Sequence, residues 1–266
     1  MRRLLNTFVR PLIRPVGVRL GYYKRNRRQN HAIIPEDMDE ASVRIFERVK
    51  PFTMTTPERV SALVDAVRFV SANGIPGSIV ECGVWRGGST MAAALTLKEL
   101  GDETRDIYLF DTFAGMNAPT KEDVECNGTH ASARWEKKKI DDNSSYWCMS
   151  PLEETRQNVL STDYPAERIH FIKGPVEETL PEKKPSGPIA VLRLDTDWYV
   201  STKHELTHLF PQLMENAPII IDDYGHWQGA KQAVDEYLEE QGLQMPLRAI
   251  DYTGVVGYKP PPRSHG

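Results

Sequence analysis

Two strand-like runs that end in paired carboxylates constrain this chain more than any other feature. One run, residues 192–197, ends in Asp195 and Asp197, and the other, residues 219–223, ends in Asp222 and Asp223. A segment of helical length separates them. Because the carboxyl ends of parallel strands meet at one edge of a sheet, we expect all four carboxylates in one crevice. Carboxylates at this density repel one another unless a cation lies among them, and oxygen ligands favour Mg²⁺, Ca²⁺ or Mn²⁺.

Strand-like and helix-like runs alternate through the rest of the chain. The expected strands are residues 77–82, 106–110, 168–173, 189–194 and 218–221, with 247–252 and 254–258 as a closing antiparallel pair. Segments with apolar residues at helical spacing separate the parallel strands. This alternation predicts one doubly wound α/β domain with helices on both faces of its sheet.

Two capping signals predict where helices begin. Thr55 and Glu58 form a capping-box pattern before the helix that precedes the first strand. Thr202 and Glu205 do the same for the helix between the two acidic strand ends. A shorter helix, at about residues 36–49, connects the N-terminal region to the domain.

A glycine-rich loop follows the first expected strand, at residues 83–89. Glycines let the backbone approach a ligand closely and a helix N-terminus offers unpaired N–H groups, which together favour a nucleoside-bearing ligand. The spacing of Gly83, Gly87 and Gly88 does not fit a dinucleotide-binding fingerprint, and the loop contains no P-loop lysine. Asp111 ends the second strand, where it could bind ribose hydroxyls; the alternative is an aspartate that caps the next turn.

Residues 114–150 form a long polar segment without a regular pattern. Such a segment in a compact domain is usually a lid or disordered, and its position at the functional edge of the sheet favours a lid. We therefore predict a basic extension and connector helix at residues 1–50, the α/β domain at 51–260 and a disordered tail at 261–266.

Charge divides the chain unevenly. Residues 1–29 contain nine basic residues and no acidic one, whereas the remaining 24 basic residues stand against 37 acidic residues, a formal charge of −13. The acidic body argues against binding of nucleic acid over a broad face. Arginines interleave with apolar residues in 1–29, which allows peripheral contact with an anionic membrane, although Pro11 and Pro15 favour a solvated or partner-docked extension.

The number of cysteines and the lack of long apolar runs indicate the cellular compartment of the protein. Three cysteines are too few for a disulfide framework, and no run reaches the ~18 apolar residues that span a bilayer. The N-terminus also lacks the apolar block and cleavage site of a secretory signal. We therefore expect a cytoplasmic protein.

Four motifs in order give the chain a family likeness. They are VECGVWRGGS at residues 80–89, FDTFAGM at 110–116, LRLDTD at 192–197 and IDDYG at 221–225. Over about residues 50–260 the sequence closely resembles the macrocin O-methyltransferase family. These enzymes use S-adenosylmethionine and a divalent metal to methylate sugar hydroxyls of natural products.

The resemblance implies a fold, ligands and residue roles. The fold is a Rossmann-like methyltransferase sheet of seven strands with its last pair antiparallel, and the acceptor is a small-molecule glycoside. It assigns Asp195, Asp222 and Asp223 to Mg²⁺ (or Mn²⁺), Asp197 to the general base, and a homo-oligomeric state. The residues that it places at the cofactor are Thr53, Met54, Glu81, Cys82, Gly83, Val84, Trp85, Gly87, Ser89, Asp111, Thr112, Gly174 and Val176.

Two other functions remain open from the residues. Asp195-Thr196-Asp197 also matches the two-aspartate metal motif of nucleotide-sugar glycosyltransferases, although that motif explains neither the glycine loop nor Asp222 and Asp223. A degenerate fold that serves as a membrane-recruited binding protein through residues 1–29 is the non-enzymatic alternative.

Overall fold

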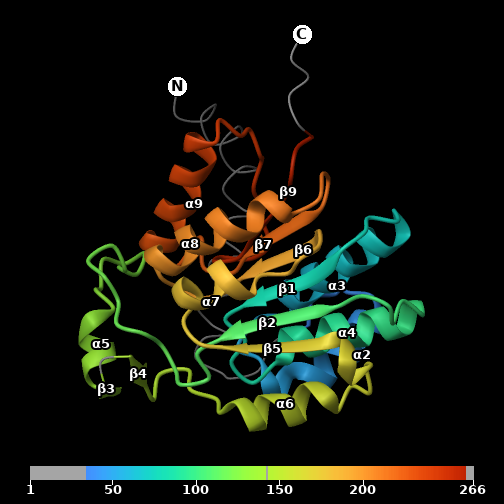
Figure 1. The fold of residues 1–266 in the computed structure, drawn as a ribbon, viewed down its shortest axis with the longest axis horizontal. Helices are drawn as coiled ribbons and strands as arrows, with labels where there is room; N and C mark the ends of the chain where they lie inside the picture. Colours follow the sequence, from blue (N-terminus) through green and yellow to red (C-terminus); the bar gives the residue numbers. More distant parts are fainter. Residues whose placement is uncertain (1–33, 142, 262–266) are drawn as a thin grey trace, which may run out of the picture. The chain divides into compact units, whose positions relative to one another are not determined.

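A mixed sheet of seven strands forms the centre of the part of the chain that the structure, a computed structural model, describes: residues 34–141 and 143–261 (Figure 1). Its strand order is β5-β2-β1-β6-β7-β9-β8. The first five are parallel, and β9 runs antiparallel to both β7 and β8. The strands are β1 (Ser78–Cys82), β2 (Ile107–Asp111), β5 (Ile169–Lys173), β6 (Ile189–Leu194), β7 (Pro218–Ile221), β8 (Arg248–Ala249) and β9 (Val255–Tyr258). The predicted α/β sheet with its closing antiparallel pair is confirmed.

The two central strands are buried along their whole length. Every residue of β1 and of β6 is buried, as is usual for parallel strands covered on both faces. Each of these strands nevertheless carries one acidic or basic side chain, the carboxylate of Glu81 on β1 and the guanidinium of Arg193 on β6. Charged residues at such positions need partners, because burial of an unpaired charge is costly.

Helices cover both faces of the sheet, as predicted (Figure 1). On one face α2, α3 and α4 pack against one another, with α6 against α4, and on the other face α8 packs between α7 and α9. The helices are α2 (Glu40–Val49), α3 (Pro57–Ala72), α4 (Gly88–Leu100), α5 (Ser132–Glu136), α6 (Leu152–Leu160), α7 (Val176–Lys183), α8 (Tyr199–Leu209) and α9 (Gln228–Glu240), with 3₁₀ turns η1 (Lys50–Phe52), η2 (Ala166–Arg168) and η3 (Phe210–Gln212). The residues from Met38 onward form one compact unit, which includes the expected connector helix α2.

The helix starts differ from the capping signals in the sequence. Thr56, not Thr55, caps α3: its Oγ1 accepts from the Arg59 amide at 3.3 Å, and Pro57 occupies the first turn. Thr55 instead shares a hydrogen bond with Thr53, at 2.6 Å between the hydroxyl oxygens. Helix α8 begins at Tyr199, before the expected Thr202. Both capping-box predictions were therefore wrong. Thr55 pairs with Thr53 instead of capping α3, and Thr202 lies inside α8.

The segment at 114–150 is partly folded and lies beyond the carboxyl ends of the strands (Figure 1). It contains α5 and a small hairpin of β3 (Lys139–Asp141) and β4 (Ser144–Ser145). Gly115 has φ 87°, and a Cβ there would lie 1.9 Å from the Ser145 carbonyl oxygen, so only glycine permits this approach. The segment thus sits at the functional edge, where it was expected, and its action as a lid stays a prediction.

Other sequence predictions concern residues 1–29 and the tail at 261–266. Apart from Pro261, these residues lie outside the part of the chain that the structure describes. Within the described part, no helix has the length and apolar character to cross a membrane.

Candidate functional site

A cavity of about 320 Å³ opens at the carboxyl edge of the sheet. The glycine loop after β1, the ends of β2, β6 and β7, the start of α7 and the 114–150 segment all contribute to its wall. Most of the sequence-predicted site residues line it, namely Thr53, Met54, Glu81, Gly83, Val84, Trp85, Ser89, Asp111, Thr112, Gly174, Val176, Asp195, Asp197, Asp222 and Asp223. Cys82 and Gly87 do not: Cys82 is fully buried in the core, and Gly87 caps α4.

The glycine loop brings the first strand against the acidic turn after β6. Gly83 has φ 80°, and a Cβ there would lie 2.0 Å from the Asp195 carbonyl oxygen. Gly87 caps α4 in the left-handed region, at φ 91°. The loop is therefore shaped by backbone approaches that a side chain would block, and it leaves the N-terminal amides of α4 at the cavity edge.

Asp111 holds this loop to the end of β2. Its Oδ2 accepts from the amides of Val84 at 2.7 Å and Trp85 at 3.0 Å, and its Oδ1 accepts from the Phe113 amide at 2.6 Å. The turn-capping role that was the alternative for this aspartate is therefore present in the structure. Asp111 also lines the cavity, so the capping role does not exclude contact with a ligand. Its contact with a ribose stays a prediction.

Three carboxylates that line the cavity lie close together. One oxygen each from Asp195, Asp197 and Asp223 lies within 4.8 Å of the others. Asp223 Oδ2 is buried and accepts no hydrogen bond from any residue that the structure describes. An orphaned carboxylate oxygen beside two further carboxylates is a donor set that suits a hard divalent cation.

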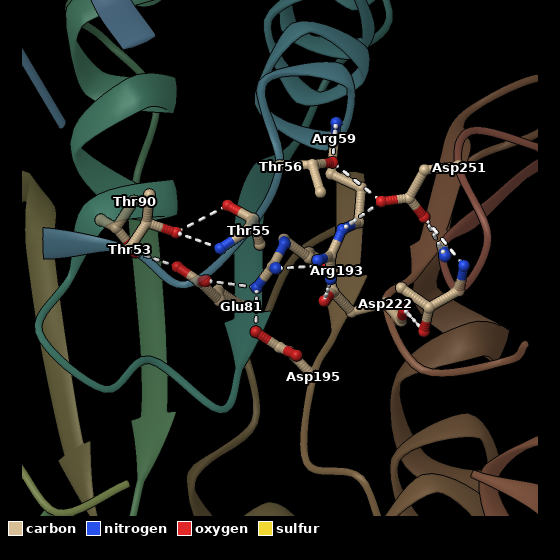
Figure 2. A network of polar contacts seen from close by, with 12 residues as sticks. Thr53, Thr55, Thr56, Arg59, Glu81, Thr90, Arg193, Asp195, Asp222 and Asp251 are labelled. Atoms are coloured by element: carbon tan, nitrogen blue, oxygen red, sulfur yellow. Dashed lines mark hydrogen bonds and ion pairs between the residues drawn. The ribbon is translucent and has the colours of Figure 1, made fainter. Parts of the chain in front are cut away.

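Asp222 does not belong to that trio; it lies next to Asp195, between two buried arginines (Figure 2). Arg193 Nη2 donates to Asp222 Oδ1 at 2.5 Å, and Arg59 Nη1 pairs with Oδ2. Burial alone would raise the pKa of Asp222, but Arg193 and Arg59 hold it below its usual range. The metal-ligand role assigned to Asp222 stays a prediction, and in this structure both of its oxygens bind guanidinium groups.

Arg193 joins three neighbouring strands through one guanidinium (Figure 2). Besides Asp222 after β7, its Nη1 donates to Glu81 Oε1 on β1 at 2.7 Å and to Asp195 Oδ2 after β6 at 2.8 Å. The second oxygen of Glu81 accepts from the Thr90 hydroxyl on α4. Arg193 lies within one of the four sequence motifs, but the sequence predicted no role for it, because its partners come from different strands.

A second arginine extends the network to the end of the chain. Arg59 on α3 pairs through Nε with Asp251 Oδ2 at 3.0 Å, and the Thr56 hydroxyl donates to the same oxygen at 2.8 Å. The other oxygen of Asp251 accepts from the amides of Thr253 and Gly254 at 2.9 and 2.7 Å. Sequence reasoning missed Arg59 and Asp251, because no local pattern connects residues so far apart.

Asp197 reaches the cavity through a strained turn. Strand β6 ends at Leu194, and Asp197 has φ 69°, in the left-handed region. The two aspartates therefore share the cavity through this turn rather than through the pleat of an extended strand. Thr196 within the turn donates to Glu205 Oε1 at 2.9 Å, and Glu205 is fully buried beneath it.

Asp197 is partly buried among other carboxylates. Burial, followed by the charges of Asp195 and Asp222, raises the pKa of Asp197 to about 7, against hydrogen bonds from Asp223 and Trp227. A divalent cation among the same carboxylates would act in the opposite direction and favour the charged form.

Three tryptophans, Trp147, Trp198 and Trp227, form another wall of the cavity. Trp198 contacts Trp147 and Trp227 edge-on, at 5.5 and 4.9 Å between ring centroids. Its Nε1 donates to the Asn117 carbonyl at 3.1 Å, which ties this wall to the 114–150 segment. Arg134 from α5 completes it, with its guanidinium carbon 4.1 Å from the Trp147 ring centroid. The cavity thus has a glycine-loop side and an aromatic side, with the carboxylates between them.

Comparison with known proteins places the chain in a family. The sequence model of the macrocin O-methyltransferase family matches residues 16–259. An 8-demethyl-8-(2,3-dimethoxy-alpha-L-rhamnosyl)-tetracenomycin-C 4'-O-methyltransferase of Streptomyces olivaceus is 34% identical over 203 residues, which cover 76% of this chain and 74% of that protein. The demethyldecarbamoylnovobiocin O-methyltransferase of Streptomyces niveus is also 34% identical, with the same shares covered.

A solved structure shows the same relationship. The O-methyltransferase NovP superimposes with a TM-score of 0.69 and 29% sequence identity, covering 79% of this chain and 83% of that one. These matches decide against the glycosyltransferase and against the non-enzymatic binding protein. The chain belongs to the macrocin O-methyltransferase family and is an S-adenosylmethionine-dependent O-methyltransferase.

Proposed function

We propose that this enzyme methylates a sugar hydroxyl of a small-molecule glycoside and needs Mg²⁺ or Mn²⁺ to do so. The observation that carries the proposal is the trio of Asp195, Asp197 and Asp223, whose oxygens lie within 4.8 Å of one another between the glycine loop and the aromatic wall. The relatives support the acceptor class, since one of them is named for 4'-O-methylation of a rhamnosyl tetracenomycin.

The methyl donor would bind on the glycine-loop side. The loop around Gly83 and the N-terminus of α4 would hold its methionine part, and Asp111 with Thr112 its ribose. Gly174 and Val176 line the cavity where α7 begins, and we assign them to the adenine side. S-adenosylmethionine supplies there an electrophilic methyl group on a sulfonium.

The metal would bind between donor and acceptor. Asp195, Asp222 and Asp223 are its proposed ligands, and Asp223 offers an oxygen that no described residue occupies. Arg193 and Arg59 each bind one oxygen of Asp222 and so hold its carboxylate in one orientation. A cation would bind through the lone pairs that the two arginines do not use. A bound divalent cation stabilises the oxygen anion that forms when the acceptor hydroxyl loses its proton.

Asp197 is the proposed general base. Its strained turn directs it toward the space between Asp195 and Asp223, and the buried Glu205 holds the turn through Thr196. Asp197 accepts the hydroxyl proton while the oxygen–carbon bond forms and the carbon–sulfur bond breaks, which yields a methyl ether and S-adenosylhomocysteine. Alignment of two bound substrates can remove roughly 7–11 kcal/mol of the barrier.

A labelled-methyl transfer assay tests the reaction and its metal. Purified enzyme, labelled S-adenosylmethionine and Mg²⁺ are incubated with sugars, glycosylated natural products and catechols. We expect label in a glycoside, loss of transfer in excess chelator, and recovery when Mg²⁺ or Mn²⁺ is restored. Full turnover in chelator would refute the metal requirement, and transfer only to catechols would refute the sugar acceptor.

Substitution of Asp197 tests its role as base. Asp197→Asn removes the proton acceptor but keeps the shape of the side chain, so transfer should fall by about 100-fold or more. Binding of S-adenosylhomocysteine, measured by calorimetry, should not change. Asp235→Asn, on the surface of α9 beside Lys231, is the matched control and should retain activity. Lost S-adenosylhomocysteine binding in Asp197→Asn would show a structural or cofactor role instead.

A further inference from the structure

We propose that the acceptor carries a negatively charged group, a carboxylate or a phosphate, that Arg134 binds. This inference rests on the proposed function, because it concerns the acceptor side of the same cavity. It narrows the glycoside class to anionic glycosides, such as a uronic acid glycoside or a sugar phosphate.

The charges that line the cavity single out Arg134. Among the described residues, seven carboxylates and two guanidiniums line it. Arg59 is committed to Asp222 and Asp251, and its side chain is only 10% exposed. Arg134 makes no ion pair and no side-chain hydrogen bond with any residue that the structure describes, and it is exposed. It is therefore the cation on this wall whose donors are available to a ligand.

The orientation of Arg134 is already set. Its guanidinium lies over the face of Trp147, at 4.1 Å from the ring centroid, and Trp147 is itself buried and contacts Trp198. Stacking leaves the N–H edges of the guanidinium free, and these edges match a planar carboxylate or a phosphate in a bidentate fashion. Trp198 directly follows Asp197, so Arg134 is connected to the proposed base through two side chains in contact, Trp147 and Trp198.

The negative charge of the cavity makes Arg134 important for any anionic ligand. An anionic ligand that approached the cavity would be repelled by its carboxylates, which a nearby guanidinium counteracts. Arg134 is followed by Lys137 and Lys138, both exposed, in a chain whose residues after 29 are strongly acidic. A neutral acceptor would gain much less from this local concentration of positive charge than an anionic one.

A binding experiment without turnover tests the proposal. Calorimetry compares three probes on the enzyme saturated with S-adenosylhomocysteine and Mg²⁺: methyl glucoside, methyl glucuronide and a phosphorylated methyl glucoside. The wild-type enzyme should bind at least one anionic probe about 10-fold more tightly than methyl glucoside, since hydrogen bonds between charged groups are strong. The probe that gains most distinguishes a carboxylate from a phosphate as the group that is recognised.

Two variants of Arg134 and one control assign the preference to this residue. Arg134→Gln should abolish it and Arg134→Lys should retain part of it. Lys137→Gln, which removes a neighbouring charge outside the cavity wall, should leave it intact. A preference that survives Arg134→Gln would show that the metal or the lysines bind the anion, and this result would overturn the proposal.

The other possible results of the calorimetry also test the proposal. Equal binding of all three probes, or binding of none, would overturn the proposal and leave Arg134 as a cover for Trp147. Binding of S-adenosylhomocysteine and methyl transfer are measured on the same preparations. If both are present in the wild-type enzyme while that enzyme shows no preference for an anionic probe, the anionic acceptor fails and the methyltransferase function stands. If S-adenosylhomocysteine does not bind even to the wild-type enzyme, it is the proposed function that fails.

Discussion

Arg193 shows how one residue can organise a site that it does not enter. Its side chain is 3% exposed and touches carboxylates that follow or belong to three adjacent strands. Those carboxylates are buried as well, or lie at the cavity floor, so each depends on the guanidinium for compensation of its charge. A buried ion pair adds little stability over an apolar pair, but removal of one partner is strongly destabilising.

Replacement of Arg193 should therefore cost far more than replacement of a surface arginine. Arg193→Met leaves Glu81, Asp195 and Asp222 without their main cation and should lower the free energy of unfolding by about 3–5 kcal/mol. Arg68→Met, which breaks ion pairs with exposed Asp39 and Asp65, is the control and should cost about 1 kcal/mol or less. Urea unfolding measures both, and equal losses would contradict the buried network.

At this scale the sequence predicted the carboxylates but not their partners. Asp195 and Asp222 could be brought together because strand ends share an edge of a parallel sheet, which is a rule of topology. The Arg59–Asp222 contact joins residues 163 positions apart, and it depends on how closely α3 approaches the end of β7. No pattern in the sequence encodes that approach.

At the scale of elements, the start of α2 depends on one aspartate. Asp39 Oδ1 accepts from the amides of Ala41 and Ser42 at 3.0 and 3.1 Å. Arg68 on α3 donates to both oxygens of Asp39, at 2.8 and 3.1 Å. The cap thus begins one helix and ties it to the next.

The stability that Asp39 contributes should depend on pH. Hydrogen bonds from Arg68 and Ser42 hold the pKa of Asp39 below its usual range. A group whose pKa is lowered on folding stabilises the protein above its unfolded pKa, near ~3.9, and loses that contribution as pH falls through the folded pKa. Asn keeps the cap but not the charge, so wild type should exceed Asp39→Asn by up to about 1 kcal/mol at neutral pH, given the exposure of the pair.

Urea unfolding from neutral pH down to strongly acidic pH measures the difference. It should shrink as the carboxyl group of the wild type becomes protonated, because the two side chains then carry the same charge. A difference that stays constant with pH would contradict the ion pair and indicate a loss of packing.

Element boundaries were the weakest part of the sequence analysis. The apolar runs predicted that the strands exist and in which order they come. They did not predict that Thr56 caps α3 or that α8 begins at Tyr199. Threonine can cap a helix, pair with a neighbouring threonine or lie within a helix, and tertiary contacts decide among these roles. The hairpin of β3 and β4 was not foreseen at all, since both of its strands are short and polar.

At the scale of the whole molecule, the proposed donor-binding and acceptor-binding residues come from different segments. The proposed donor residues lie on loops of the sheet, whereas the aromatic wall comes largely from residues 114–150 and the loops after β6 and β7. The sheet follows a periodic sequence and a recognisable family, so it could be predicted. The wall could not, because its contacts join irregular segments.

The basic extension should be dispensable for catalysis. Among the described residues, all that line the cavity belong to the compact unit that begins at Met38. Deletion of residues 1–29 should therefore leave methyl transfer and S-adenosylhomocysteine affinity unchanged. A truncated enzyme that is folded by circular dichroism but inactive would show that the extension contributes to a site. Light scattering on both forms would also test the predicted homo-oligomer.

The position of the tryptophans has a practical consequence. The chain has five, of which Trp85, Trp147, Trp198 and Trp227 line the cavity. Trp135 packs in one buried cluster with Trp147, Trp198 and Trp227. Tryptophan emission therefore arises at the cavity and the cluster beside it, and the rings of Trp147, Trp198 and Trp227, 4.9–6.1 Å apart, will exchange excitation energy. The enzyme carries its own optical label, so quenching or a spectral shift can report arrival of donor, metal or acceptor without any attached dye.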